Sequence, residues 1–165
     1  MTAPEAIEAD SRQRRLALVA SQGTLDQAYP PFILATTAAS LGWEAGIYFT
    51  FYGLDILHKD RVDKLKVAPL ANPAGPLQIP NIVGAIPGAT ALATATMKRW
   101  MDGSAMPTIP EFIEMARDLD VRFFACATTM GVMNVEESDL IDGCDIAGAA
   151  AFLDYAADAD VQLFV

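Results

Sequence analysis

A cysteine at the end of a short apolar run is the residue in this sequence best suited to do chemistry. Residues 121–125 are rich in β-branched and aromatic side chains, which predicts a buried strand. Cys126 follows directly, and Thr128 or Thr129 is of a type that caps a helix. We therefore expect Cys126 to lie where a strand ends and a helix begins, beside unpaired N–H groups and the positive end of the helix dipole.

That position would favour the thiolate, which is the nucleophilic form of cysteine. The same pattern is equally compatible with a buried cysteine that packs as a small hydrophobic residue. Two thiols, Cys126 and Cys144, are too few for a disulfide framework, and their spacing matches neither CxxC nor a zinc site. From the residues alone, a reactive sulfur centre and a structural cysteine remain equal alternatives.

Other kinds of site have less support. The single histidine, His58, cannot build a typical metal cluster, and we expect it to be a solvated surface residue. No GxGxxG motif is present, so we expect neither dinucleotide binding nor another cofactor. The net charge of -10 opposes nucleic-acid binding, which requires a basic surface.

The composition indicates one domain with a surface buried between subunits. The chain has 165 residues, 53% of them hydrophobic, and a mean hydropathy of +0.28. Residues 1–13 are expected to form a mobile arm without a secretory signal, and residues 14–165 a single domain in the cytoplasm. Residues 67–97 carry no charge, which suits a loop or a subunit contact, and their prolines argue against a membrane span.

Strands alternating with helices predict an α/β fold, a flavodoxin-like open parallel five-stranded sheet with helices on both faces. We expect the strand order 2-1-3-4-5. The predicted strands are residues 14–21, 44–51, 121–125, 144–147 and 161–165, and the main helices are residues 25–41, 90–101, 110–119 and 148–157.

In that order, three loops would meet at one edge of the sheet, around Cys126. The loop after the first strand contains Gly23, Thr24 and Asp26, and we favour a helix-capping role for Asp26 over ligand orientation. The loop after the second strand contains Phe51, Tyr52 and Gly53. Thr128 and Thr129 follow the cysteine and could add hydroxyl donors. These eight residues form the predicted binding surface.

Four pieces of the chain, in this order, are similar to the DsrE/DsrF/TusD-like sulfur-relay family, in its DsrE-like branch. They are Gly23-Thr24-Leu25-Asp26-Gln27-Ala28, Phe49-Thr50-Phe51-Tyr52-Gly53-Leu54, Phe124-Ala125-Cys126 with Thr129-Met130, and Asp139-Leu140-Ile141-Asp142-Gly143 before Ala147-Gly148. The resemblance covers most of the chain from Arg15 onward. It implies a sulfur carrier whose cysteine, at the position of Cys126, holds a persulfide or a thiosulfonate.

The resemblance also implies homo-oligomers, often trimers or multiples of them, and exchange of sulfur with TusA-like or rhodanese-like proteins. Cys144 departs from the pattern; we favour packing over a role as resolving thiol or second carrier. Two alternatives to a carrier stay open: a thiol-disulfide redox enzyme that uses Cys126 with Cys144, and a non-catalytic oligomeric partner subunit. The redox enzyme requires the two Cα atoms to come within about 7 Å.

Overall fold

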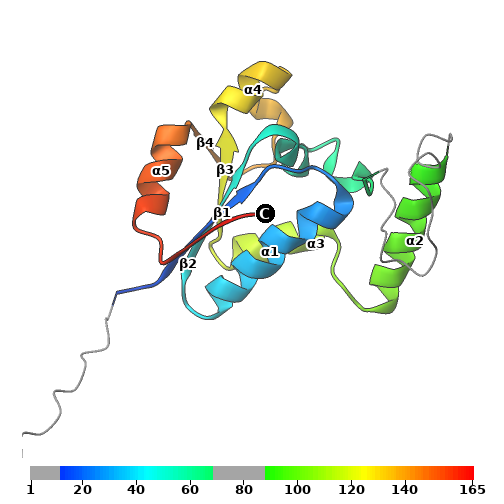
Figure 1. Cartoon of the computed structure of the whole chain (residues 1–165), viewed down its shortest axis with the longest axis horizontal. Coiled ribbons are helices and arrows are strands. Elements are labelled where there is room, and N and C mark those ends of the chain that lie inside the picture. The colour runs from blue at the N-terminus through cyan, green and yellow to red at the C-terminus, as the bar shows by residue number, and fades with distance from the viewer. Residues whose placement is uncertain (1–11, 69–87) are drawn as a thin grey trace, which may run out of the picture.

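A parallel five-stranded sheet forms the centre of the protein, as seen in the computed structural model, which describes residues 12–68 and 88–165 (Figure 1). The strands are β1 (Arg15–Ala20), β2 (Glu44–Phe49), β3 (Arg122–Cys126), β4 (Cys144–Ala147) and β5 (Val161–Phe164). All four neighbouring pairs are parallel. The predicted α/β class with an open parallel sheet is confirmed.

The predicted strand order is wrong. The observed order is β4-β3-β2-β1-β5, so β1 lies beside β2 and β5 and does not contact β3. The physical reason lies in β2, whose residues 45–49 are buried without interruption. A strand buried on both faces belongs in the centre of a parallel sheet, whereas the expected order would have placed β2 at the edge.

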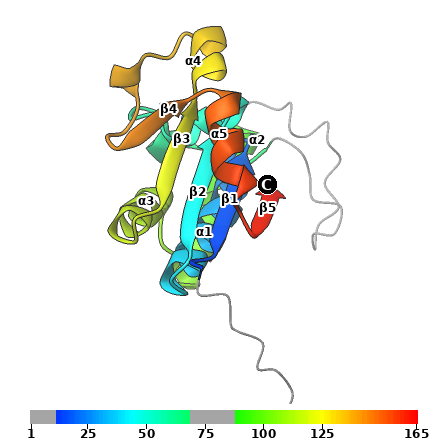
Figure 2. The ribbon, with the colours of Figure 1, turned by 90° about the vertical axis from the view of Figure 1, so that its left-hand side faces the viewer.

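Helices cover both faces of the sheet, and their predicted ranges agree with the structure to within a few residues. Within the described residues, the α-helices are α1 (Leu25–Ser40), α2 (Ala89–Gly103), α3 (Ile109–Asp118), α4 (Ala127–Met133) and α5 (Ala149–Ala157). Short 3-10 helices are η1 (Phe51–Ile56), η2 (Val62–Lys64) and η4 (Glu137–Asp139). Figure 2 shows α5 on one side of the sheet, with α1 and α3 on the other.

The two faces hold separate hydrophobic cores. On the α1 and α3 side, Phe32 packs against Phe49 and Phe123 with ring centroids 6.0 Å apart in both pairs. On the α5 side, a smaller core contains Tyr48, Cys126 and Phe152. Side chains alternate between faces along a strand, so Cys126 belongs to the smaller core.

Two of the predicted segments lie wholly or partly outside the described residues. The expected arm at 1–13 and the uncharged segment at 67–97 overlap residues 1–11 and 69–87, which are not described. The end of the uncharged segment forms the first part of α2, a helix in which Thr94 is the one buried residue. Within residues 12–68 and 88–165, no helix is both long and apolar enough to cross a membrane.

Candidate functional site

Cys126 ends β3 and serves as the N-cap of α4. Its Sγ accepts a hydrogen bond from the backbone N–H of Thr129 at 3.4 Å. The expectation that Thr128 or Thr129 caps this helix is therefore wrong, because the sulfur itself takes the acceptor position of a capping side chain. The side chain is only 5% exposed, so the sulfur lies just below the surface at the edge of the sheet where the strands end.

Thr129 joins the cysteine to the loop that follows β2. Its hydroxyl lies 3.1 Å from the Thr50 hydroxyl and accepts a hydrogen bond from the Phe51 backbone N–H at 3.0 Å. Thr129 is 4% exposed, whereas the neighbouring Thr128 points to solvent. Of the two predicted threonines, only Thr129 takes part in the hydrogen-bond network around the sulfur.

Hydrogen bonds lower the pKa of Cys126 from 9.0 to about 7, although burial alone would raise it. The Thr129 backbone N–H donates to the sulfur. The Tyr48 hydroxyl and the hydrogen-bonded pair of Thr129 and Thr50 hydroxyls add to the lowering of the pKa. Each bond stabilises the negatively charged sulfur more than the neutral thiol. A substantial fraction of Cys126 is therefore thiolate near neutral pH, without a histidine or any other general base.

Sequence reasoning missed Tyr48 and Thr50. Tyr48 pairs in register with Phe124, so Thr50 comes beside Cys126 on the neighbouring strand. Both side chains share the face of Cys126, because residues two apart along a strand point to the same side. The sequence does indicate that Tyr48 and Thr50 lie on the same face of the second strand, because side chains alternate along it. That face lies beside Cys126 only because β2, and not β1, is adjacent to β3.

The loop after β1 reaches the site only through the loop after β2. A Cβ atom on Gly23 would lie 2.1 Å from the Tyr52 carbonyl oxygen, and one on Gly53 would lie 2.2 Å from the Ala20 carbonyl oxygen. Only glycine allows such close backbone contact. The two loops are therefore in close backbone contact with each other. In the sheet, β2 lies between β1 and β3, the strand that ends in Cys126.

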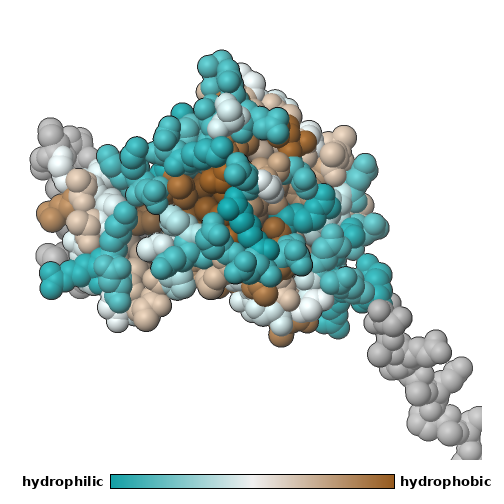
Figure 3. Space-filling model, turned by 180° about the vertical axis from the view of Figure 1, so that it is seen from behind, coloured by the Kyte–Doolittle hydropathy of each residue, from teal (hydrophilic) through white to brown (hydrophobic). Residues whose placement is uncertain are grey.

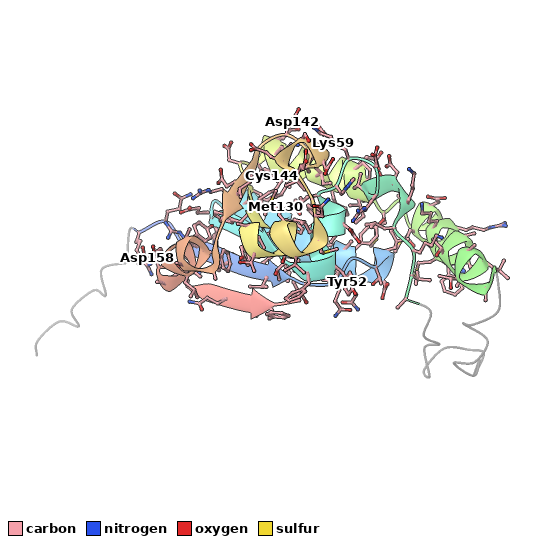
Figure 4. The ribbon with its side chains drawn as sticks, turned by 90° about the horizontal axis from the view of Figure 1, so that it is seen from above. Tyr52, Lys59, Met130, Asp142, Cys144 and Asp158 are labelled. Atoms are coloured by element: carbon pink, nitrogen blue, oxygen red, sulfur yellow. The ribbon has the colours of Figure 1, made fainter. Side chains whose placement is uncertain are left out.

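Phe51 and Tyr52 lie at the surface in the loop after β2, and the exposed fractions of these residues are 63% and 68%. Phe51 has a φ of 46°, which is rare for a bulky residue, and its N–H is held by Thr129. Figure 4 looks down on α4 and shows Tyr52 on one side of that helix and Cys144 on the other.

Asp26 does not form the expected cap. Thr24 occupies the N-cap position of α1 without a side-chain capping bond, and Asp26 lies in the first turn. The Thr24 hydroxyl and one Asp26 carboxylate oxygen are buried without a hydrogen-bond partner. The preference for Asp26 as a capping residue is therefore wrong, since an N-cap precedes the helix whereas Asp26 lies inside it.

Cys144 lies too far from Cys126 for a disulfide. It pairs with Phe123, three residues before Cys126, and it packs against the core on the opposite face of the sheet. Strand spacing and rise put the two Cα atoms about 11 Å apart, beyond the limit of about 7 Å. Burial, with weaker effects of nearby charges, raises the pKa of Cys144 to about 11.

His58 is buried, at 8% exposure, so its prediction as a solvated residue is wrong. Its Nδ1 accepts a hydrogen bond from the Asp60 backbone N–H, and its backbone bridges to Leu140. The buried run before it draws the histidine inward, because Leu54, Ile56 and Leu57 all belong to the larger core. Among the described residues, no group of three or more His, Cys, Asp or Glu side chains could hold a metal ion.

Comparisons with known proteins give consistent matches. The profile of the DsrE/DsrF/DrsH-like family matches residues 12–164. The chain is 40% identical over 159 residues to the sulfur carrier protein DsrE2 of Allochromatium vinosum, covering 93% of this chain and 99% of that protein. It is 31% identical to the uncharacterized protein YrkE of Bacillus subtilis, covering 92% of this chain and 97% of that one.

Among solved structures, the ychN protein from E. coli matches with a TM-score of 0.49 and 12% identity. The match covers 93% of this chain and 100% of that one.

Proposed function

This chain belongs to the DsrE/DsrF/DrsH-like family, and from that membership and the chemistry of Cys126 we propose that it is a sulfur carrier. Cys126 holds sulfane sulfur or a thiosulfonate and passes it to a partner protein. The observation that carries this proposal is the thiol at the β3–α4 junction, whose pKa is lowered to about 7 by hydrogen bonds from Thr129, Tyr48 and Thr50.

Loading requires only the Cys126 thiolate. It attacks the outer sulfur of a donor persulfide, a new S–S bond forms on Cys126, and the donor leaves as a thiolate when its own S–S bond breaks. With tetrathionate, thiosulfate leaves and the remaining S–SO3 unit stays on Cys126. The sulfur species bound to Cys126 is in each case an anion or a weak acid. The hydrogen-bond donors that stabilise the Cys126 thiolate can stabilise this species in the same way.

The partner side of the proposal is a second protein with a nucleophilic thiol or a persulfide. TusA-like and rhodanese-like proteins fit this chemistry, and a reducing compartment such as the cytoplasm would keep Cys126 free for it. Phe51 and Tyr52, exposed and uncharged beside the site, suit a protein contact. Gly23, Gly53 and Thr129 hold the loops in place, whereas Thr24, Asp26 and Thr128 are proposed to line the outer part of the binding surface.

We also propose a homo-oligomer, a trimer or a multiple of one. Large apolar side chains are exposed at Leu153 and Phe164, by 64% and 73%. On the face seen from behind, Figure 3 shows a further group of hydrophobic residues at the surface amid hydrophilic ones. Such exposed apolar surface is common at subunit contacts. Sedimentation equilibrium would measure the assembly.

The redox-enzyme alternative loses support from the geometry, because Cys126 and Cys144 face opposite sides of the sheet. The remaining alternative is a partner subunit with a structural cysteine, which the low exposure of Cys126 favours. An Ellman titration of the native protein separates it from a carrier, because a structural thiol would not react.

The decisive experiment is intact mass spectrometry of the reduced protein after brief exposure to tetrathionate, thiosulfate or polysulfide. We expect a gain of one or more sulfur atoms, or of an S–SO3 unit. The gain should persist in Cys144→Ser and disappear in Cys126→Ser. No adduct on wild-type protein would favour the structural partner subunit, and loss of two hydrogens that depends on both cysteines would favour the redox enzyme.

A further inference from the structure

Tyr48 is a polar aromatic residue that lies on the cysteine face of the central strand. It belongs to β2 and pairs with Phe124, so Cys126 lies two residues further along the adjacent strand on the same face. A tyrosine can span that diagonal distance between neighbouring strands. The backbone register alone therefore directs the phenol toward the sulfur.

Packing fixes the ring in this position. Tyr48 is 7% exposed and stacks on Phe152 of α5, with ring centroids 4.6 Å apart and planes 14° from parallel. Phe152 in turn contacts Phe124 at 5.7 Å. A buried tyrosine held between the sheet and a helix loses little additional freedom when its hydroxyl binds a partner.

The Tyr48 hydroxyl acts on the sulfur of Cys126, which lies on the same face of the sheet and in the same core, and it is one of the groups that lower the pKa of that thiol. Burial, together with that contact, raises the pKa of Tyr48 well above its usual range, so the phenol keeps its proton across the working pH range. A protonated phenol beside sulfur donates its hydrogen, and the bond is strongest when the sulfur is a thiolate.

We propose that the Tyr48 hydroxyl is a catalytic hydrogen-bond donor that makes Cys126 a good leaving group during the release of sulfur. This inference rests on the proposed function. In the release step, an acceptor thiolate attacks the outer sulfur of the Cys126 persulfide and forms a new S–S bond. The old S–S bond breaks, its electron pair returns to Cys126, and Tyr48 donates to the thiolate that forms.

No charged side chain competes for this role among the described residues that pack around the sulfur. The groups acting on Cys126 are hydroxyls and an N–H. The Cα of Arg122 on β3 lies about 13 Å from that of Cys126 along the strand. Its guanidinium pairs with Asp145 and lies 4.6 Å from the centroid of the Phe124 ring, and it is not among the groups that shift the pKa of Cys126. Asp55 on η1 pairs with Arg61, and Asp154 on α5 points to solvent.

Removing the phenol should affect release and attack differently. A thiolate of lower pKa leaves faster but attacks more weakly, with a Brønsted slope of about 0.4–0.5. If Tyr48→Phe raises the pKa of Cys126 by about one unit, release slows by about threefold at every pH. Attack slows by about threefold well below the pKa, where thiolate is scarce, and quickens by about threefold well above it.

The test uses Cys144→Ser protein as the background, so that Cys126 is the one thiol. Tyr48→Phe is compared with Tyr155→Phe. Tyr155 belongs to the same core, but its hydroxyl donates a hydrogen bond to the Leu16 carbonyl oxygen instead. Attack is followed as the rate of iodoacetamide alkylation against pH. Release is followed on polysulfide-loaded protein as thiocyanate formed with cyanide, in which the Cys126 thiolate is the leaving group.

The expected result is slower release in Tyr48→Phe, with alkylation profiles that cross those of the background protein, while Tyr155→Phe follows the background in both assays. Equal release rates and overlapping profiles would overturn the inference. Changes of the same sign at every pH would also overturn it, because they indicate loosened packing. Failure of the background protein to load sulfur refutes the proposed function instead, and the alkylation profiles still test the hydrogen bond.

Discussion

The two cysteines occupy adjacent strands of one sheet, but their surroundings give them opposite chemistry. Cys126 is the more buried of the two and has a pKa lowered to about 7, whereas the half-buried Cys144 has a pKa raised to about 11. Burial acts against the thiolate in both cases. The difference in pKa comes from the hydrogen-bond donors around Cys126, which stabilise its thiolate. Cys144 has nearby charges of both signs, whose effects on its pKa oppose one another.

Position along the strand explains where the donors come from. Cys126 ends its strand and begins α4, so the free N–H groups of a helix start are beside it. Cys144 begins its strand, at the opposite end of the sheet, after the turn at residues 142–143. In a parallel sheet, helices begin after the carboxyl ends of the strands, and a cysteine at the other end has no such neighbours.

The largest expected effect is on the pH at which each thiol reacts. At pH 7 about half of Cys126 is thiolate, compared with about one Cys144 in ten thousand. We expect alkylation of the Cys144→Ser protein to reach half of its maximal rate near pH 7, and that of Cys126→Ser near pH 11. Midpoints are compared rather than rates, since the two thiols differ in exposure. Coincident midpoints would remove the contrast between them.

The position of Cys126 at a strand–helix junction was predictable because its local sequence determines it. An apolar run, a cysteine and small hydroxyl residues specify a strand, a junction and a helix whatever lies beside them. The identity of the donors was not predictable in the same way. Tyr48 and Thr50 act on the sulfur because β2 is adjacent to β3, and the pairing of strands depends on the packing of the whole sheet.

His58 and the N-terminus of α1 show the same limit. A histidine next to Lys59 and Asp60 has the local sequence of a surface turn, but the buried run before it holds it in the core. Thr24 at the N-cap of α1 and Asp26 in its first turn are both good capping types, and neither side chain makes a capping bond. Both errors come from judging a residue by its neighbours in sequence rather than in space.

The next largest effect is expected from Gly53→Ala. Its Cβ would lie 2.2 Å from the Ala20 carbonyl oxygen, so the loop after β2 must shift, at a cost of roughly 1–3 kcal/mol in the free energy of unfolding. The shift would move Thr50 and the Phe51 N–H away from Thr129. Urea denaturation measures the loss, and alkylation should show a raised pKa for Cys126 with that of Cys144 unchanged.

Gly131→Ala is the matched control for this substitution. Gly131 lies inside α4, and a Cβ there would meet nothing within 4 Å. Alanine should stabilise that helix by roughly 0.5–1 kcal/mol. Equal destabilisation by the two substitutions would show that the close contact between the loops does not hold the site together.

Thr129→Val should have an intermediate effect, because it removes one donor to the sulfur and leaves the Phe51 N–H without an acceptor. We expect the pKa of Cys126 to rise by about one unit. Absorbance of the thiolate at pH 7 should fall accordingly. Thr128→Val, on the exposed neighbour, should change neither the absorbance nor the pKa, and an equal change in both variants would contradict the assigned network.

The smallest effect is expected at Cys144, from Asp145→Asn. Burial is the main cause of the raised pKa there, and the Asp145 charge adds to it while Arg117 acts against it. Asp145 is more than half exposed and already pairs with Arg122, so solvent and the arginine screen its charge. The alkylation midpoint of Cys144 should therefore fall by only about a few tenths of a unit. Asp154→Asn, on the exposed side of α5, should leave it unchanged. A fall of a full unit or more would mean that charge, rather than burial, keeps Cys144 protonated, and that the two cysteines differ in electrostatics more than in hydrogen bonding.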